Sequence, residues 1–249
     1  MKKILSAGCS FVYGSELSDC PEMYSVEKHS QKTWPALYAS HNNFLYETSA
    51  FCGASNSGIV RYTINKIEIS QPDFVIVQWT FLSRYEIRLN RFDLDENDSY
   101  YYAIYPYQSK DFSNKEKHLD IVIEKLHPVI RDLSTFWYRF VDNDISQLYY
   151  YLKSRLELAN YLRYKNIPFV FCDSETINFN LLKTTSDKSL VNLVNLNDDI
   201  PFISFDGLGF IDYCKKNNYK FGINHPLDEA HVSAHDLISR ELDHFTNNL

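Results

Sequence analysis

The chain has 249 residues, of which 45% are hydrophobic and 16% aromatic, and this is enough to bury one large core. A formal net charge of −7 argues against a nucleic-acid partner, because nucleic-acid binding needs a basic face. Five scattered cysteines without a CxxC pair favour reduced thiols over a disulfide framework. The first residues turn polar at Ser6 and no apolar span follows, so we expect no membrane partner and a cytoplasmic location by default, with association with a virion as the alternative.

Strands and helices alternate along the predicted chain. The continuous apolar run at 74–77 is typical of a strand buried on both faces of a parallel sheet, and leucines at helical spacing mark 145–165 as the clearest helix. Alternation of this kind predicts an α/β fold, a three-layer α/β/α sandwich with a mostly parallel, flavodoxin-like sheet, built as one domain from 1 to 249. The expected elements, in chain order, are strand 3–7, helix 33–41, strand 43–48, helix 56–69, strand 72–80, helix 145–165, strand 167–173 and helix 228–245.

Two regions interrupt this alternation and are predicted to be insertions, near 88–140 and 174–205. The first is rich in tyrosine, and the second is polar and looks irregular. Aromatic side chains of this kind form either a packing layer or a protein-binding surface. The alternative is a lid or a wall that contacts carbohydrate, because rings stack on sugar faces.

Candidate catalytic residues follow the predicted strands. Ser10 comes after the first strand in a segment flanked by Gly8 and Gly14, and His225 lies near the far end of the chain. The carboxyl ends of parallel strands open onto one edge of the sheet, where a serine with small neighbours is a candidate nucleophile and a histidine its base. Cys9 is expected to be a buried thiol and not the nucleophile.

Taken in order, these segments resemble the blocks of the SGNH (GDSL-like) hydrolase family, in a divergent branch associated with bacterial and phage proteins. Gly8-Cys9-Ser10 stands for the family's G-D-S block and Gly53 for its second-block glycine. Thr80 takes the place of the asparagine in the third block. His225-Pro226 matches the last block, but Gly222 stands where the family's D-x-x-H pattern has its aspartate.

The resemblance implies that Ser10 attacks a carbonyl carbon while His225 removes its proton. Backbone amides of Ser10 and Gly53 would bind the oxyanion, with Thr80 or Asn56 completing the site. The missing aspartate leaves two readings open: a Ser–His dyad in which a backbone carbonyl or a water molecule holds the other imidazole nitrogen, or loss of catalysis. Asp228, three residues after His225, either supports the histidine or caps the last helix.

Other polar residues carry further expectations. Arg84 and Glu86 share a face of an extended segment and are expected to form a pair, with substrate binding by Arg84 as the alternative. His231 and His235 lie one helical turn apart but lack the glutamate of an H-E-x-x-H site. The sequence therefore predicts no metal site and no cofactor.

These features favour a serine hydrolase that cleaves an ester through a Ser10 acyl-enzyme. The expected substrate is a small molecule or a glycan ester, such as an O-acyl group on a carbohydrate. Two alternatives remain: a catalytically impaired binding or structural protein of a phage particle or surface assembly, and an acyltransferase that uses the same serine.

Overall fold

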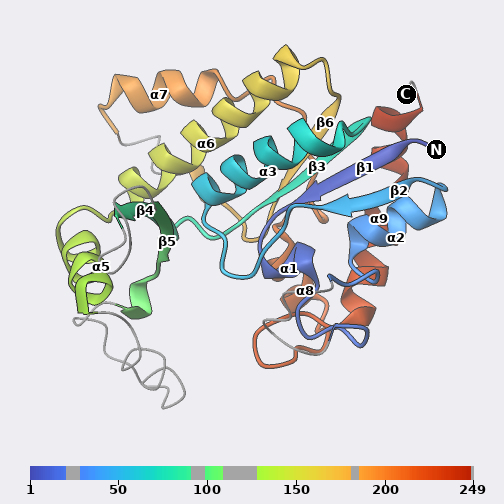
Figure 1. Ribbon diagram of the computed structural model, residues 1–249, viewed down its shortest axis with the longest axis horizontal. Helices are drawn as coiled ribbons and strands as arrows, with labels where there is room; N and C mark the ends of the chain where they lie inside the picture. The colour runs from blue at the N-terminus through green and yellow to red at the C-terminus, as the bar shows by residue number, and fades with distance from the viewer. Residues whose placement is uncertain (21–28, 91–98, 109–127, 181–184, 248–249) are drawn as a thin grey trace.

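A parallel four-stranded sheet forms the centre of the molecule (Figure 1). The computed structural model describes residues 1–20, 29–90, 99–108, 128–180 and 185–247. The sheet has the strand order β2–β1–β3–β6, and every residue of β3 is buried, as its apolar run predicts. The bounds of its strands are β1 (Lys3–Ala7), β2 (Leu45–Thr48), β3 (Phe74–Trp79) and β6 (Phe169–Asp173).

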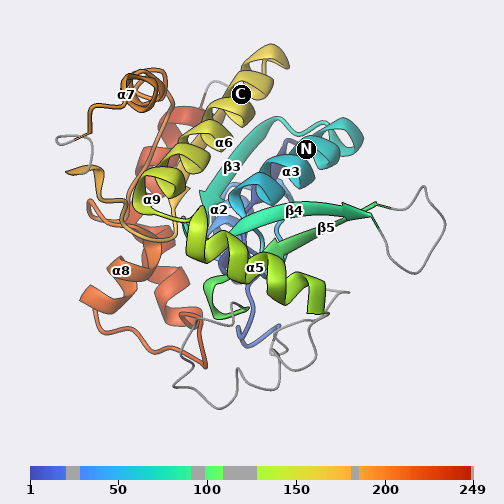
Figure 2. The same ribbon diagram turned by 90° about the vertical axis from the view of Figure 1, so that its left-hand side faces the viewer.

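Two pairs of helices cover the sheet. Helix α2 (Trp34–His41) packs on α9 (Asp228–Thr246), and α3 (Asn56–Ser70) packs on α6 (Asp144–Tyr164). Figures 1 and 2 show the two pairs on opposite faces of the sheet. Right-handed crossovers explain this, because the chain moves outward from β1 to β2 and then back past β1 to β3. The predicted three-layer α/β sandwich with a parallel sheet is confirmed.

The reversal of direction at β1 also fixes where a ligand can bind. Strands β2 and β3 lie on either side of β1, so the connections leaving β1 and β3 diverge at their carboxyl ends. A crevice outside this switch point is the usual ligand site of an open parallel sheet. The segment that carries Ser10 leaves β1 at this point.

The region 88–140 contains regular elements. Strands β4 (Tyr85–Asn90) and β5 (Ser99–Ile104) form an antiparallel pair, followed by a 3₁₀ turn, η1 (Pro106–Gln108), and helix α5 (Pro128–Phe140). Tyr85, Ile104 and Ile130 form a small apolar cluster separate from the main core. Tyr102 and Tyr138 pack against this cluster, whereas Tyr101 is exposed. The side chains of Tyr100 and Tyr107 and the residues 109–127 lie outside the described part. The boundaries of both insertions stay a prediction.

The expectation of an irregular segment at 174–205 is wrong in part. Helix α7 (Lys188–Asn195) lies within it, and Asp187 caps the helix by accepting hydrogen bonds from Ser189 N and Leu190 N. A second short helix, α8 (Phe210–Lys216), follows. Both were too short to show a clear period in the sequence. In the described part of the chain, no helix has the length and apolar character needed to cross a bilayer.

Candidate active site

Ser10 stands on the first turn after β1. The chain makes a single helical turn here, α1 (Ser10–Tyr13), where the sequence suggested a loop. Gly8 allows the sharp approach to β3, because a Cβ at this position would lie 2.6 Å from Val12 Cγ2 and 3.0 Å from the Gln78 carbonyl oxygen. Cys9 is fully buried, as expected for a structural thiol.

His225 meets Ser10 across the molecule. Its Nε2 lies 2.8 Å from Ser10 Oγ although 215 positions separate the two residues in the sequence. Burial lowers the pKa of His225 below its usual value, and the hydrogen bond and charge of Glu16 oppose this shift only in part. The imidazole is therefore neutral near pH 7, which is the form that accepts a proton from a hydroxyl.

The second nitrogen of this imidazole contacts Glu16, a residue that is not among those predicted for the site. Glu16 Oε2 lies 2.8 Å from His225 Nδ1. The same carboxylate accepts hydrogen bonds from the backbone amides of Ile223, Asn224 and His225. Burial alone would raise the pKa of Glu16, but the bonds from Asn224, His225 and Ile223 outweigh it and lower the pKa. Glu16 is thus an ionised acid that holds the ring by Nδ1–H.

Gly222 explains why an acid from so far away fits. A Cβ at position 222 would lie 2.8 Å from Glu16 Oε2 and 3.0 Å from its Cδ. This is the position where the family pattern places its aspartate, so the Glu16 carboxylate occupies the space next to a missing side chain. A glycine at a position expected to hold an acid was the one sequence signal that could have prompted a search for another carboxylate.

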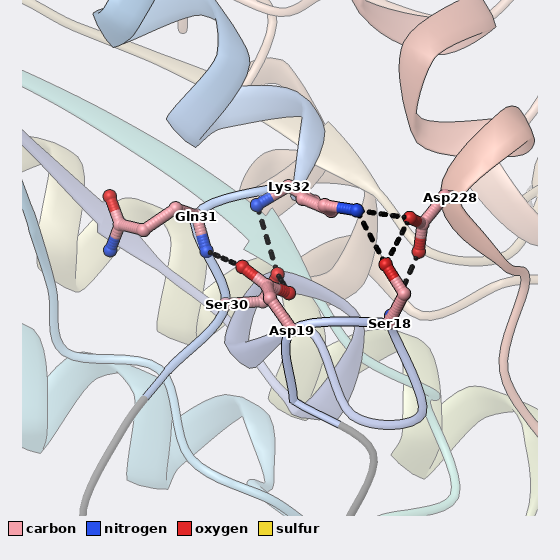
Figure 3. A network of polar contacts seen from close by, with 6 residues as sticks. All are labelled: Ser18, Asp19, Ser30, Gln31, Lys32 and Asp228. Carbon is pink, nitrogen blue, oxygen red and sulfur yellow. Dashed lines mark hydrogen bonds and ion pairs between the residues drawn. The ribbon is translucent and has the colours of Figure 1, made fainter.

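Asp228 has a different task from the one expected. Among the described residues its hydrogen bonds and ion pair are with Ser18 and Lys32 and not with His225, and it does not cap α9, whose N-cap residue is Leu227. Its Oδ1 accepts from Ser18 N at 3.0 Å, and its Oδ2 accepts from Ser18 Oγ and, at 2.8 Å, from Lys32 Nζ (Figure 3). Burial opposes these bonds, yet they lower the pKa of Asp228 to about 2. Asp228 therefore ties the segment that carries Glu16 to the start of α9.

A neighbouring carboxylate holds the other side of the same segment. Asp19 accepts from Ser30 Oγ and from Gln31 N, the latter at 2.8 Å, as Figure 3 also shows. The turn between α1 and these anchors includes a positive φ of 69° at Glu16, a conformation that a non-glycine residue keeps only when its surroundings impose it. The two anchored carboxylates supply that constraint.

The predicted oxyanion residues lie around the same edge. Gly53 has a φ of 77°, and Tyr105 Oη donates to its carbonyl oxygen at 2.6 Å. Asn56 does not aim a free amide at Ser10. Its Oδ1 accepts from Thr80 N at 2.9 Å and its Nδ2 donates to Thr80 O at 3.4 Å, so Asn56 clamps the end of β3. Thr80 Oγ1 accepts from Arg84 Nη1 at 3.0 Å, which leaves the hydroxyl proton available for another acceptor.

The expected pair between Arg84 and Glu86 is wrong. Glu86 instead receives two bonds from Arg61, with Nε at 3.1 Å and Nη2 at 2.9 Å. Arg61 projects from α3, which packs beside β4, and its planar guanidinium matches both carboxylate oxygens. Arg84 turns to the opposite side and contacts Thr80.

His231 and His235, the two histidines one helical turn apart, make structural contacts. Trp34 N donates to His231 Nδ1 at 3.2 Å, and burial lowers the pKa of His231 to about 3. His235 Nδ1 contacts Asp236 Oδ1 at 2.8 Å. Among the described residues, no group of three or more His, Cys, Asp or Glu side chains is arranged to hold a metal ion.

A separate cavity of about 350 Å³ lies beyond the end of β6. Arg155, Asp173 and Phe202 are part of its lining, whereas Ser10, Glu16 and His225 are not. This cavity is therefore separate from the Ser10–His225–Glu16 group.

No model of a known protein family matches the sequence, and no curated protein resembles it significantly. Solved structures do resemble the fold. They include the psychrotrophic esterase EstA of a Pseudoalteromonas species (10% identity, all of both chains, TM-score 0.52) and TesA (8% identity, 98% of this chain and 99% of that one, TM-score 0.51). A carbohydrate esterase family 2 enzyme of Corynascus thermopiles is also similar (10% identity, 99% of this chain and 67% of that one, TM-score 0.52). The chain thus has the SGNH-hydrolase fold.

Proposed function

We propose that the chain is a serine esterase whose catalytic group is Ser10, His225 and Glu16. The observation that carries this proposal is the continuous relay Ser10 Oγ–His225 Nε2 and His225 Nδ1–Glu16 Oε2, with 2.8 Å at each contact. These are the distances expected of a nucleophile, its base and the group that orients the base.

In the proposed reaction, Ser10 Oγ attacks the carbonyl carbon of an ester while His225 Nε2 takes the hydroxyl proton. The tetrahedral oxyanion is bound by the backbone amides of Ser10 and Gly53 and by the Thr80 hydroxyl. His225 then returns the proton to the departing alkoxide, leaving an acyl group on Ser10. A water molecule, deprotonated by the same imidazole, releases the acid and restores the serine.

Glu16 takes the role that the family assigns to the aspartate before the histidine. Its bond to Nδ1–H fixes the tautomer with a bare Nε2 facing Ser10, and its charge stabilises the imidazolium formed during attack. Two absences motivate the alternative of an impaired binding protein, that of the aspartate and that of the third-block asparagine; the position of Glu16 answers the first of them.

The support for a substrate class comes from the fold, so the class that we propose is a broad one. We propose a small-molecule or glycan ester, with an O-acyl group on a carbohydrate as the finer assignment. Support comes from the similar fold of a carbohydrate esterase family 2 enzyme. Transfer of the acyl group to an alcohol in place of water would use the same Ser10 intermediate, and product analysis with an alcohol acceptor separates the two outcomes.

The direct test is turnover of p-nitrophenyl acetate by the purified chain and two serine variants. Ser10→Ala removes the attacking oxygen and should abolish hydrolysis while circular dichroism and the melting temperature stay near those of the parent. Ser15→Ala is the matched control, because Ser15 is also buried on this segment and its Oγ lies 3.0 Å from Cys52 Sγ. Equal turnover by Ser10→Ala and the parent would reject the nucleophile.

A further inference from the structure

Arg84 brings a positive charge to the edge of the sheet that carries the proposed catalytic group. Its guanidinium lies 3.0 Å from Thr80 Oγ1 and 4.6 Å from the centre of the Phe81 ring. The Phe81 ring contacts Phe11, and Phe11 in turn lies 5.3 Å from the His225 ring, centre to centre. Two aromatic rings, Phe81 and Phe11, therefore connect Arg84 to the base.

The charge of Arg84 acts on this site. Burial is the main cause of the lowered pKa of His225, and the Arg84 charge lowers it further. On its other side, Arg84 lies 5.6 Å from the ring of Tyr105, whose hydroxyl holds the Gly53 carbonyl. The guanidinium thus lies between Thr80 and Tyr105, the residue that holds the second-block glycine.

Within the described residues, no carboxylate lies at ion-pair distance from Arg84. Glu86, its expected partner, is occupied by Arg61. Glu175 is close enough for the charges to interact, but its Oε1 accepts from Leu82 N, and burial raises its pKa. The guanidinium of Arg84 has five N–H donors, and in the described part of the chain one of them donates to a neutral hydroxyl, that of Thr80. An arginine placed like this has donors left for a ligand.

We propose that Arg84 binds an anionic group of the substrate, so that the preferred esters carry a carboxylate or a phosphate close to the scissile bond. This inference rests on the proposed esterase function and narrows its substrate class. A planar guanidinium pairs with either anion through two parallel N–H···O bonds, and such charge-assisted bonds are stronger than neutral ones. The bond from Nη1 to Thr80 holds the fork in place for that pairing.

A rival role for Arg84 makes a different prediction. If the residue only orients and polarises the Thr80 hydroxyl as an oxyanion donor, its loss slows neutral and anionic esters by the same factor. If it binds an anion, its loss removes the advantage of the anionic ester. The ratio of the two kcat/KM values separates these roles.

The experiment compares p-nitrophenyl butyrate with mono-p-nitrophenyl succinate, which places a carboxylate at the end of a similar acyl chain. We expect the parent protein to prefer the anionic ester by about 10- to 100-fold, as one charge-assisted hydrogen-bonded pair allows. Arg84→Gln should bring the ratio near one, Arg84→Lys should keep part of it, and Arg84→Glu should favour the neutral ester. Arg88→Gln is the matched control, because it removes an equal charge from an exposed position on β4, four residues further along the chain.

The outcomes are distinct. A ratio in Arg84→Gln equal to that of the parent, or a parent without preference for the anion, overturns the anion-binding role while neutral-ester turnover still supports the esterase. Equal slowing of both esters in Arg84→Gln assigns the residue to Thr80 and also overturns it. Absence of turnover of either ester by folded parent protein rejects the esterase itself. Added salt should reduce the preference of the parent, because it screens an accessible ion pair, and this readout needs no variant.

Discussion

Two carboxylates that expose little surface have pKa values shifted in opposite directions in this molecule. The Glu16 side chain is 10% exposed and Asp173 is 7% exposed. Glu16 accepts from three backbone amides and from His225, and these bonds overcome the effect of burial and lower its pKa. Asp173 accepts one bond, from Tyr151 Oη at 2.7 Å, and burial raises its pKa to about 7 despite the opposing charge of Arg155.

Two causes explain the difference: Asp173 lies deeper than Glu16, and it accepts fewer hydrogen bonds. A carboxylate that must stay ionised next to an imidazolium needs donors fixed in advance, and the turn 222–225 supplies them to Glu16. Asp173, held by one hydroxyl, instead gives up its charge near neutral pH. Substitutions of the two acids should therefore affect different properties, the first catalysis and the second stability.

The largest effect is expected from Glu16→Gln. The amide cannot stabilise the imidazolium, so kcat should fall by about 10⁴-fold, the loss known for the orienting acid of a serine triad. Glu16 raises the pKa of His225, so its neutralisation should also move the acidic limb of the kcat/KM profile to lower pH. A pH series with p-nitrophenyl acetate measures both.

A matched acid keeps that result specific. Glu229→Gln removes an exposed carboxylate from the first turn of α9 and should leave both the rate and the profile unchanged. If Glu16→Gln behaves like Glu229→Gln, the relay ends at His225 and the chain works as a dyad.

A second, smaller effect is the recovery of kcat when an acid at position 222 replaces Glu16. Glu16→Ala should lower kcat strongly and vacate the space beside Gly222. Gly222 is not among the glycines with positive φ, so a side chain there is compatible with its backbone. Adding Gly222→Asp to Glu16→Ala should therefore restore kcat by about tenfold or more, within the range that an orienting acid controls.

Gly222→Asp alone is expected to lower activity, whereas the same substitution added to Glu16→Ala is expected to raise it. Gly222→Asp in the presence of Glu16 puts a Cβ 2.8 Å from its carboxylate oxygen and adds a like charge, so it should lower both activity and melting temperature. Failure of the double variant to exceed Glu16→Ala would show that position 222 cannot reach the imidazole.

The smallest effect on the reaction is expected at Asp173. Its pKa is raised from 3.8 to about 7 in the folded state, so the fold binds a proton more tightly than the unfolded chain does. The stabilisation this gives is present below about pH 4 and is lost as the pH rises through 7, on the order of a few kcal/mol in total. Asp173→Asn keeps an acceptor for Tyr151 but cannot ionise.

Thermal unfolding between pH 5 and pH 8 provides the readout for this variant. The melting temperature of the parent should fall more over this interval than that of Asp173→Asn. Parallel curves would mean that Asp173 is already ionised in the fold at pH 5, and the contrast with Glu16 would disappear.

The sequence was sufficient for the parts of the site that follow strand ends. Ser10 and Thr80 come directly after the buried strands β1 and β3, and parallel strands present such residues on one edge. His225 was predicted from its place before the last helix. Their convergence needed no knowledge of side-chain contacts.

Glu16 and the partner of Arg84 depended on contacts that the chain order does not reveal. Glu16 reaches His225 through a left-handed residue and a turn tied to Asp228, and no local pattern encodes that geometry. Arg84 and Glu86 are close in the sequence, with Glu86 on β4 and Arg84 just before it. Arg61 on α3 nevertheless pairs with Glu86, because its Nε and Nη2 each donate to one carboxylate oxygen. Sequence spacing shows which residues are close along the chain, whereas tertiary packing determines which residues pair with His225 and with Glu86.

The central claim is that His225, held by Glu16, activates the oxygen of Ser10. Labelling with a fluorophosphonate followed by peptide mass spectrometry tests it most directly, because the reagent records an activated serine whatever the natural ester is. We predict one adduct on the peptide that contains Ser10, formed more slowly by Glu16→Gln and absent from Ser10→Ala. An adduct on another residue, or no adduct on folded protein, would contradict the account.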